Sequence, residues 1–340
     1  MRTRVVLLAL LSLALGLWGG FTFASPKTIT VCPSGCEYTS IQDAINAASP
    51  GDTIRIGPGI YEENLVIHKG LILRGAGRDE SVIKGKKEEK PVILIESDEE
   101  IYVTIVGLKI TQAKKYEDGI RIGGKCRVTI RDSQISDNAK RGIAIVDSSH
   151  ATVENNSISG NGVGIEIVSP SEDSQISYAM IRNNTISDND IGIVMGGSSL
   201  AEITNNSISN NDGDGIWITV FSQATVTDNS ISDNGKNGIF MWYSPRVTVM
   251  NNSIFGNGES GILIWGWSLS RATIEGNTIH NNKEYGVALF QRPCFDTGYT
   301  FDGAVRGKGN KIYGNGKGNV CPAQLQCLMT GGGGCYGPGC

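Results

Sequence analysis

The chain has 340 residues, a formal net charge of -4 at pH 7, 45 Gly and only 19% charged residues. The charges are spread through the chain and form no basic stripe, which argues against nucleic acid as a partner. The many Gly and few charges are typical of a turn-rich all-β protein, and the length suits one long domain.

Residues 1–24 have the features of a secretory signal peptide. Arg2 and Arg4 precede an apolar run from Val5 to Trp18, and Ala24 is a suitable last residue of the leader. The run is shorter than the ~20 residues of a membrane span, and no second apolar stretch follows it. We therefore expect an exported protein, periplasmic or extracellular, with no membrane span after cleavage.

Eight Cys suit an oxidising compartment. Cys32 and Cys36 are close enough in sequence to bridge a tight loop. The other six allow fifteen pairings, among which the sequence does not choose: Cys126, Cys294, Cys321, Cys327, Cys335 and Cys340. A metal cluster in the Cys-rich tail, residues 316–340, is the alternative; the tail lacks a paired CxxC and a nearby His.

One amphipathic helix is predicted, over Thr39–Ala48 within an N-terminal cap formed by residues 25–52. Thr39 and Gln42 form a capping box ahead of it. Its apolar residues share one face: Ile41, Ala44, Ile45 and Ala48. Such a helix covers the apolar end and the open strand edge of the first coil of a repeat structure.

Residues 53–315 are predicted to form the repeat structure itself. Its first two or three coils are short β-branched runs separated by longer loops: Thr53–Ile56, Asn64–Ile67, Leu71–Arg74, Val92–Ile95 and Val103–Ile110. From Gly119 each coil opens with Gly followed by an apolar residue. The first and third residues after that Gly are apolar throughout, so alternation places them inside a strand.

The repeat is anchored on an Ile that recurs at Ile135, Ile158, Ile186, Ile208, Ile231, Ile254, Ile279 and Ile312. The spacing is 22 or 23 residues, with exceptions of 25, 28 and 33. This is the length of one solenoid coil, and about ten or eleven coils at ~4.8 Å rise give a rod near ~50 Å long.

Asn lies two residues before seven of these Ile residues: Asn156, Asn184, Asn206, Asn229, Asn252, Asn277 and Asn310. Asn also follows all eight by three residues: Asn138, Asn161, Asn189, Asn211, Asn234, Asn257, Asn282 and Asn315. We expect both rows at turns, where Asn tolerates left-handed backbone, with the amides stacked into a hydrogen-bonded ladder.

The Asn-Asn-Ser-Ile-Ser coils, the entry Tyr38–Ala48 and the string Gly57-Pro-Gly-Ile-Tyr-Glu resemble right-handed parallel β-helix proteins of the pectin-lyase-like superfamily. Within it the chain is most similar to the NosD-type group, also called the carbohydrate-binding and sugar-hydrolase repeat. The resemblance runs from about Thr28 to Asn315. It implies the fold, whereas the activity stays open because this fold hosts lyases, hydrolases, epimerases and non-enzymes.

The catalytic motifs that the resemblance implies are missing from the chain. Asn211–Asp214 has a superficial likeness to polygalacturonases, but Gly-His-Gly and Arg-Ile-Lys are absent, and we interpret Asp212 and Asp214 as turn residues. Arg292-Pro293 lacks the flanking Arg of pectate lyases, and the Asp-Pro-His of mannuronan epimerases does not occur. No catalytic residue and no cofactor is predicted, with calcium left open.

The NosD name implies a copper-related role, which would call for His or Met ligands. His68, His150 and His280 are scattered, and the Met residues do not cluster: Met180, Met195, Met241, Met250 and Met329. Met195 and Met241 fall at inward core positions. No metal site is therefore predicted.

The outward positions, two and four residues after each Gly, become aromatic in the late coils. With their sequence neighbours they form what we call the aromatic stripe: Trp217, Phe240, Trp242, Tyr243, Trp265, Trp267 and Phe290. Sugar rings present apolar faces to such platforms, so the stripe is a candidate carbohydrate-binding surface. The alternative is that residues 294–340 fold back and bury the stripe, wholly or in part.

These observations leave four candidate functions. The favoured one is an exported protein that binds polysaccharide or cell-surface glycan through the aromatic stripe, without chemistry of its own. The second is a polysaccharide lyase or glycoside hydrolase with an atypical site, for which Glu166, Glu172 and Asp173 are the nearest carboxylates. The third is a structural or adhesion rod, and the fourth a periplasmic copper-related accessory protein.

Overall fold

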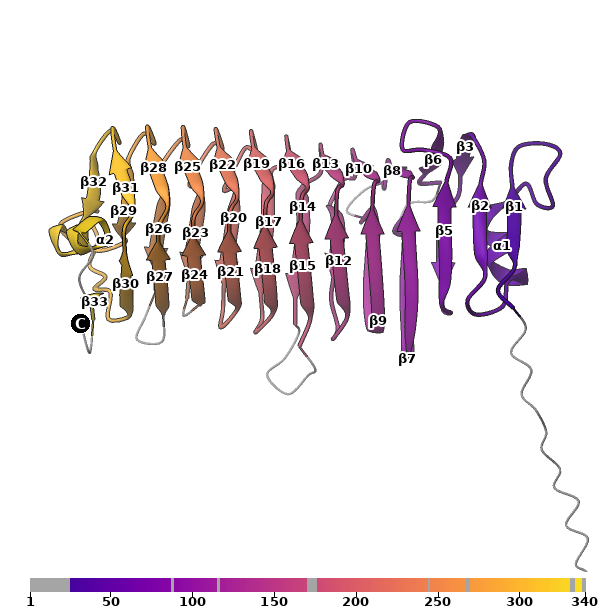
Figure 1. The fold of residues 1–340 in the computed structure, drawn as a ribbon, viewed down its shortest axis with the longest axis horizontal. Helices are drawn as coiled ribbons and strands as arrows, with labels where there is room; N and C mark the ends of the chain where they lie inside the picture. Colours follow the sequence, from indigo (N-terminus) through magenta and orange to yellow (C-terminus); the bar gives the residue numbers. More distant parts are fainter. Residues whose placement is uncertain are drawn as a thin grey trace, which may run out of the picture.

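The computed structural model describes residues 25–86, 89–114, 117–169, 176–243, 245–266, 270–330 and 334–337. The predicted signal peptide lies outside these residues, as do Glu172, Asp173 and Trp267. The chain forms one straight rod of stacked coils, with the N-terminal cap at one end (Figure 1). Among the described residues, no helix combines the length and apolar character that a membrane crossing requires.

Each coil contributes one strand to each of three faces of the rod. Face 1 contains the strands that follow the repeated Gly: β4 (Leu65–Ile67), β7 (Ile93–Val106), β9 (Ile120–Arg131), β11 (Arg141–Ile145), β14 (Val163–Val168), β17 (Ile191–Gly196), β20 (Ile216–Thr219), β23 (Ile239–Trp242), β26 (Ile262–Trp265), β29 (Tyr285–Leu289) and β32 (Gly318–Cys321).

Face 2 contains the next strand of each coil, and the long strands β7 and β9 pass from face 1 into it. Its other members are β1 (Thr28–Val31), β2 (Thr53–Ile56), β5 (Leu71–Gly75), β12 (His150–Glu154), β15 (Tyr178–Arg182), β18 (Leu200–Thr204), β21 (Gln223–Thr227), β24 (Arg246–Met250), β27 (Arg271–Glu275), β30 (Ala304–Lys308) and β33 (Gly334–Tyr336).

Face 3 is an 11-stranded sheet of short strands. They are β3 (Gly59–Glu62), β6 (Ser81–Lys84), β8 (Lys109–Thr111), β10 (Gln134–Ser136), β13 (Ser157–Ser159), β16 (Thr185–Ser187), β19 (Ser207–Ser209), β22 (Ser230–Ser232), β25 (Ser253–Phe255), β28 (Thr278–His280) and β31 (Lys311–Tyr313). Neighbouring strands are parallel, apart from β33, which is antiparallel to β30. The right-handed parallel β-helix is therefore confirmed.

The interior of the rod is a continuous column of apolar side chains from all three faces. The first and third residues after each repeated Gly are buried, as Ile216 (0% exposed), Ile218 (0%) and Met241 (1%) illustrate. The repeat Ile residues are also buried, from 0% exposed at Ile135 to 5% at Ile312. The inward register derived from the sequence is thus confirmed.

Both Asn rows form ladders along the axis. In the first row the side-chain nitrogen of Asn184 donates to Oδ1 of Asn206 at 3.0 Å, and Asn206 donates likewise to Asn229. In the second row Asn189 donates to Oδ1 of Asn211 at 3.0 Å. Each amide oxygen also accepts a backbone N–H from the preceding coil, so the buried amides are satisfied.

The expectation of left-handed backbone at the ladder residues was wrong by one position. The residue before the ladder Asn takes positive φ instead, with 56° at both Asn155 and Asn205. This turn residue is exposed and turns the corner, which leaves the ladder residue free to point inward. The acids Asp132 and Asp228 do the same before their ladder positions.

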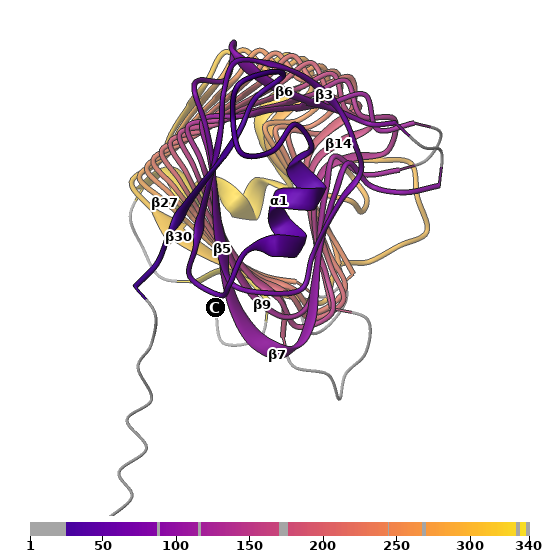
Figure 2. The same ribbon diagram turned by 90° about the vertical axis from the view of Figure 1, so that its right-hand side faces the viewer.

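The predicted helix is present as α1 (Ile41–Ala47) and lies across the open end of the first coil (Figure 2). Its predicted apolar face is buried, from 0% exposed at Ile41 to 5% at Ala48. The predicted capping box was wrong: the N-cap is Ser40, whose side chain accepts from the backbone N–H of Asp43. The Glu63 carboxylate from the next coil accepts two further N–H groups of the first turn, so capping is tertiary.

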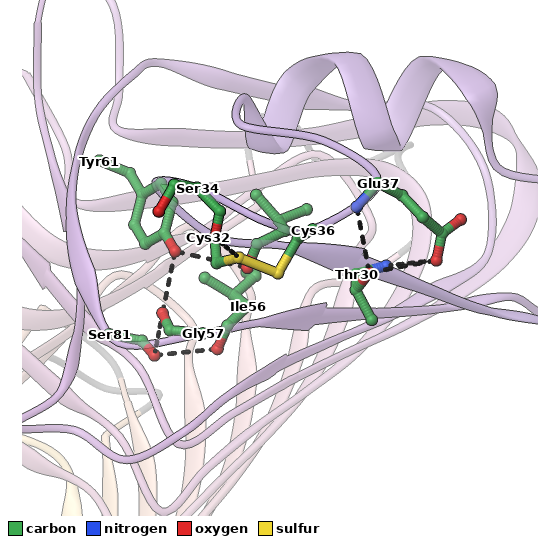
Figure 3. The surroundings of a disulfide bond; sticks show 10 residues. Thr30, Cys32, Ser34, Cys36, Glu37, Ile56, Gly57, Tyr61 and Ser81 are labelled. Carbon is green, nitrogen blue, oxygen red and sulfur yellow. Dashed lines mark hydrogen bonds between the residues drawn. A yellow bond between two sulfur atoms is a disulfide. The ribbon is translucent and has the colours of Figure 1, made fainter.

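A disulfide closes the loop after β1, between Cys32 and Cys36 (Figure 3). Beside it the hydroxyl of Tyr61 donates to the carbonyl of Gly57 at 2.9 Å, and the Ser81 hydroxyl donates to the same carbonyl at 3.0 Å. The Tyr61 hydroxyl also lies 3.4 Å from the carbonyl oxygen of Val31, at the end of β1, and so connects the cap to the first coils. The predicted bridge is confirmed.

At the far end of the rod, β30 and β31 form a coil within the predicted residues 53–315, and β32 follows it on face 1. The 3-10 helix η1 (Ala323–Gln326) and the helix α2 (Cys327–Thr330) close this end. Leu325 and Leu328 are 0% exposed in this closure. A second disulfide joins Cys294 to Cys321.

Cys126, one of the six Cys residues considered for the remaining disulfides, does not form one. Cys126 is a free, buried thiol in β9, and burial raises its pKa to about 11. A thiol with so high a pKa is almost entirely protonated at neutral pH and is a poor nucleophile.

Candidate carbohydrate-binding face

The aromatic stripe lies on the outer side of face 1. Trp217 is in register with Phe240, and Trp242 is in register with Trp265. Their strand neighbours Ile216 and Ile218 point into the core, so alternation turns these rings outward. The rings therefore stack from coil to coil because one outward position repeats at the strand spacing, ~4.8 Å.

The rings form one continuous series of contacts. Trp217 stacks on Phe240 with ring centroids 6.1 Å apart, and Trp242 lies 6.2 Å from Trp217 and 6.3 Å from Trp265. Trp265 stacks on Phe290 at 4.3 Å. The predicted members within the described residues are therefore assembled into one surface, with Tyr243 at its edge, 5.6 Å from Trp242.

At the C-terminal end of the stripe, further rings pack against Trp265 and Phe290, which stay partly exposed. The connection after β29 brings Tyr299 to 5.5 Å from Trp265, and Phe295 to 5.0 Å from Phe290. Trp217, Phe240 and Trp242 stay partly exposed, and Tyr243 is 37% exposed. The structure thus corresponds to partial coverage by the segment from Cys294, between the two alternatives of a bare and a buried stripe.

A polar row borders the aromatic rings, formed by the residue before the repeated Gly in two coils, Asp214 and Asn237, and by the residue two before it in the next coil, Glu259. The carboxylate of Asp214, 6% exposed, accepts from the backbone N–H and the side-chain nitrogen of Asn237, both at 2.9 Å. The same Asn237 nitrogen donates to Oε2 of Glu259 at 3.0 Å. An amide therefore joins two carboxylates beside Trp217 and Phe240.

Both carboxyls of this row hold their protons more tightly than usual. Burial raises the pKa of Asp214, against the opposing effect of the Asn237 hydrogen bonds. Burial also raises the pKa of Glu259, and the nearby charges of Asp214 and Glu284 raise it further. These two carboxyl groups therefore stay protonated to a higher pH than free Asp and Glu side chains do.

The sequence reasoning missed this row. Asp214 was interpreted as a turn residue, and Asn237 and Glu259 were not singled out. The position before the repeated Gly is apolar at Val163 and Ile191 and polar at Asp214 and Asn237, but it is also polar in the early coils, at Asp118 and Arg141, so the sequence signal was weak. In a parallel coil, residues at equal distance from the Gly lie side by side.

Glu166, the one proposed catalytic carboxylate within the described residues, lies on an earlier part of face 1. Arg141 donates to it and also to Asp118, at 2.7 Å, and all three side chains are largely buried. Because a guanidinium holds this carboxylate, Glu166 has a structural ion pair and is separate from the Asp214 row. Glu172 and Asp173 lie outside the described residues.

The described residues do not fit a copper site. No group of three or more His, Cys, Asp or Glu side chains is placed to hold a metal within this part of the chain. Nδ1 of His68 contacts the carbonyl of Glu96, His150 lies against Arg127, and His280 stacks on Phe255. Met195 and Met241 are buried core residues.

Family models match the chain over two overlapping regions. The model described as "Periplasmic copper-binding protein (NosD)" matches residues 45–236, more than half of the chain, and the model "Right handed beta helix region" matches residues 171–331. No significant match was found among curated proteins.

Several solved structures with the same fold have titles that name polysaccharide-acting enzymes. The A-module of a mannuronan C-5 epimerase from Azotobacter vinelandii aligns with TM-score 0.59 and 21% identity, covering 85% of this chain and 92% of that one. A periplasmic alginate epimerase aligns with TM-score 0.61 and 17% identity over 88% and 82%. An alginate lyase from a Paenibacillus species aligns with TM-score 0.55 and 18% identity over 90% and 98%.

Identities this low show the shared fold and nothing further. The extent of the family match decides the assignment: the chain belongs to the NosD family, on a right-handed parallel β-helix of the pectin-lyase-like type.

Proposed function

We propose that this protein is exported and binds a polysaccharide or cell-surface glycan along the aromatic stripe of face 1. The observation that carries the proposal is the unbroken contact series from Trp217 through Phe240 and Trp242, on rings that stay partly exposed. Soluble proteins seldom leave a run of large aromatics at the surface without an interaction partner.

The chemistry of the stripe suits a sugar chain. Aromatic faces pack against the apolar faces of sugar rings, and the polar row beside them offers oxygens that accept hydrogen bonds from hydroxyl groups. Glu259 is half-buried with one oxygen bonded to Asn237, which leaves its other oxygen for a ligand. Apolar and polar groups thus border the same line along the rod.

The rings that pack against the C-terminal end of the stripe limit where a bound sugar chain can lie. Tyr299 and Phe295 occupy the space over Trp265 and Phe290. A bound chain therefore ends or bends at this segment and extends from Trp242 over Trp217 toward the earlier coils.

Export is supported by the leader-like residues 1–24, by the disulfides Cys32–Cys36 and Cys294–Cys321, and by the periplasmic description of the family model. The polysaccharide-acting titles of the solved structures support the ligand class. Trp emission provides the test: the chain is titrated with neutral and uronate hexasaccharides. The proposal predicts a saturable change with at least one class, and a flat response to the whole series overturns it.

The Asp214 row favours a second candidate function, cleavage or rearrangement of a glycosidic chain at the edge of the stripe. General acid catalysis on sugars requires a carboxyl group that keeps its proton, and burial supplies this at Asp214 and Glu259. If this candidate holds, Glu259→Gln abolishes product formation while binding persists. If wild-type protein releases no product from any sugar that it binds, the candidate is wrong.

A further inference from the structure

The outer side of face 2 carries a groove that the sequence reasoning did not consider. Along the middle of this face threonine repeats in two runs, Thr104, Thr129 and Thr152, then Thr225, Thr248 and Thr273, with Met180 and Glu202 in register between the two runs. Longer side chains flank this row on one side, including Tyr178, Arg246 and Arg271, and others such as Arg182 and Glu275 flank it on the other. A row of short residues between rows of long ones forms a channel parallel to the rod axis.

Three hollows lie along this channel and share lining residues. The first, of about 440 Å³, includes Arg127 and His150 and meets the second at Tyr178. The second, of about 390 Å³, meets the third, of about 410 Å³, at Arg271. The channel therefore runs from β7 to β30, which is nine coils at ~4.8 Å each.

The C-terminal half of the channel concentrates positive charge. Arg246 and Arg271 are direct register neighbours, and Arg306 on the next coil is in register with Thr273, two residues beyond Arg271. All three side chains are exposed, and none takes part in an ion pair with another described residue. Side-by-side like charges are unfavourable, in a chain whose net charge is -4.

On the coils of β9 to β15 the arginines of this face are paired: Arg127 with Glu100 and Arg182 with Glu154. Arg55 and Arg74, on β2 and β5 at the other end of the face, form no ion pair with a described residue. Burial raises the pKa of Tyr178, and a hydrogen bond to the channel acid Glu202 raises it further. On face 2 of the last coils and in the turn before β30, the other charged residues are Asp302, Glu275 and Lys308. None of them forms an ion pair within the described part of the chain. The residues at 244, 267–269, 331–333 and 338–340 include no Asp or Glu.

We propose that the face 2 channel is a second binding site, in which Arg246, Arg271 and Arg306 hold the carboxylates of a linear acidic polysaccharide. This proposal does not rest on the aromatic stripe, which lies on another face of the rod. Arginine forms paired, charge-assisted hydrogen bonds with carboxylates, and the Thr248 and Thr273 hydroxyls can bond to sugar hydroxyl groups.

The shape of the site selects a linear chain over a compact anion. Cationic positions recur on successive coils along an open channel, so charges that repeat at the length of a sugar unit meet them in turn. A nucleic acid is disfavoured because Tyr178, three coils away from Arg246, is the one aromatic side chain among the described residues lining the second and third hollows, and because the basic patch is short.

The test uses the full chain and hexameric oligomannuronate, with its carboxyl-reduced, neutral form for comparison. The variant Arg246→Gln/Arg271→Gln removes two charges from the channel. Its matched control is Arg55→Gln/Arg74→Gln, which removes two exposed, register-paired arginines of face 2 that line none of the three hollows. Affinity is measured by calorimetry at low and at high salt.

We expect the channel variant to bind oligomannuronate about tenfold more weakly or worse at low salt, whereas the control variant binds as wild type does. Salt weakens wild-type binding steeply, and the channel variant loses that dependence. The stripe variant Trp217→Ala/Trp242→Ala keeps this Arg-dependent binding, so failure of the stripe and failure of the channel are separable.

Several results overturn the proposal. Equal affinity of wild type and the channel variant would show that the arginines do not contribute to binding. No binding by wild type would show that the channel is not a site for this ligand. Arg-dependent binding of the carboxyl-reduced sugar contradicts the role of charge. Tighter Arg-dependent binding of a single-stranded oligonucleotide than of oligomannuronate assigns the channel to nucleic acid.

Discussion

The backbone N–H and the side-chain nitrogen of Asn206 both donate to Oδ1 of Asn229, at 2.8 and 3.0 Å. Asn229 in turn donates to the carbonyl of Ile203 at 2.8 Å, below it, and to Asn252 above it. One buried amide therefore satisfies groups on three successive coils.

Asn229→Ala leaves these buried groups without partners, at about 1–3 kcal/mol for each unsatisfied group. We expect the free energy of unfolding to fall by about 2–4 kcal/mol. Urea denaturation measures this loss. Ser207→Ala, at an exposed strand position, serves as the control and should cost less than ~0.5 kcal/mol. Equal midpoints for the two variants would show that the ladder does not stabilise the rod.

The repeated Gly permits the coils to pack closely. A Cβ added at Gly238 would lie 2.6 Å from Cγ2 of Ile254 and 2.7 Å from the carbonyl oxygen of Gly261. Gly238→Ala should therefore lower the free energy of unfolding by about 1–3 kcal/mol through overpacking. Gly298→Ala is the control, because nothing lies within 4 Å of its added Cβ. Similar thermal midpoints for the two would contradict the packing argument.

The Cys294–Cys321 disulfide ties the covering segment to β32. It spans 27 residues, compared with 4 for Cys32–Cys36. Replacing Cys294 and Cys321 by Ser should cost about 2–4 kcal/mol and increase acrylamide quenching of Trp emission, because Tyr299 and Phe295 lose their tether over Trp265. The Cys32→Ser/Cys36→Ser variant should cost less and leave quenching unchanged. Unchanged quenching in the first variant would mean that the bond does not hold the cover in place.

Asp214 makes the stability of the rod depend on pH in a defined direction. Its pKa in the folded chain is raised by burial above the ordinary value of 3.8. The folded state therefore binds the proton more tightly than the unfolded chain does. The resulting stabilisation is fully present below the ordinary value and is lost as pH rises through the folded pKa.

Asp214→Asn keeps an oxygen that accepts from Asn237 and removes the buried charge. We expect this variant to be more stable than wild type at pH 7 and to match it near pH 3. Asp212→Asn, an exposed neighbour, is the control and should show neither change. If wild type and Asp214→Asn lose stability in parallel as pH rises, Asp214 does not cause the dependence.

The periodic part of the structure could be predicted from the sequence because each coil repeats the same requirements. Ile158 and Asn156 recur at a fixed spacing, and only one register buries the former and stacks the latter. The N-cap and the turn residues were misplaced by one position. Ser40 and Thr39 are both favourable N-cap residues, and the contact of Glu63 from another coil with Ser40 and Ile41 fixes the helix start at Ser40.

The candidate sites depend on departures from the repeat, which periodicity does not predict. The cover over Trp265 comes from an irregular segment whose path is set by the Cys294 disulfide and by ring contacts of Tyr299. The Asp214–Asn237–Glu259 row becomes visible only when residues of three coils are placed side by side. The face 2 channel likewise comes from the register of Arg246 with Arg271.

The central claim is that the rings of the stripe bind a glycan directly. The most direct measurement compares wild type, Trp217→Ala/Trp242→Ala and Tyr313→Ala in calorimetric titration with the neutral hexasaccharide that changes wild-type Trp emission most. Tyr313 is a 50% exposed aromatic on face 3 and serves as the control. The account predicts that the stripe variant binds at least about tenfold more weakly and that Tyr313→Ala binds as wild type does. Wild-type affinity in the folded stripe variant would contradict it.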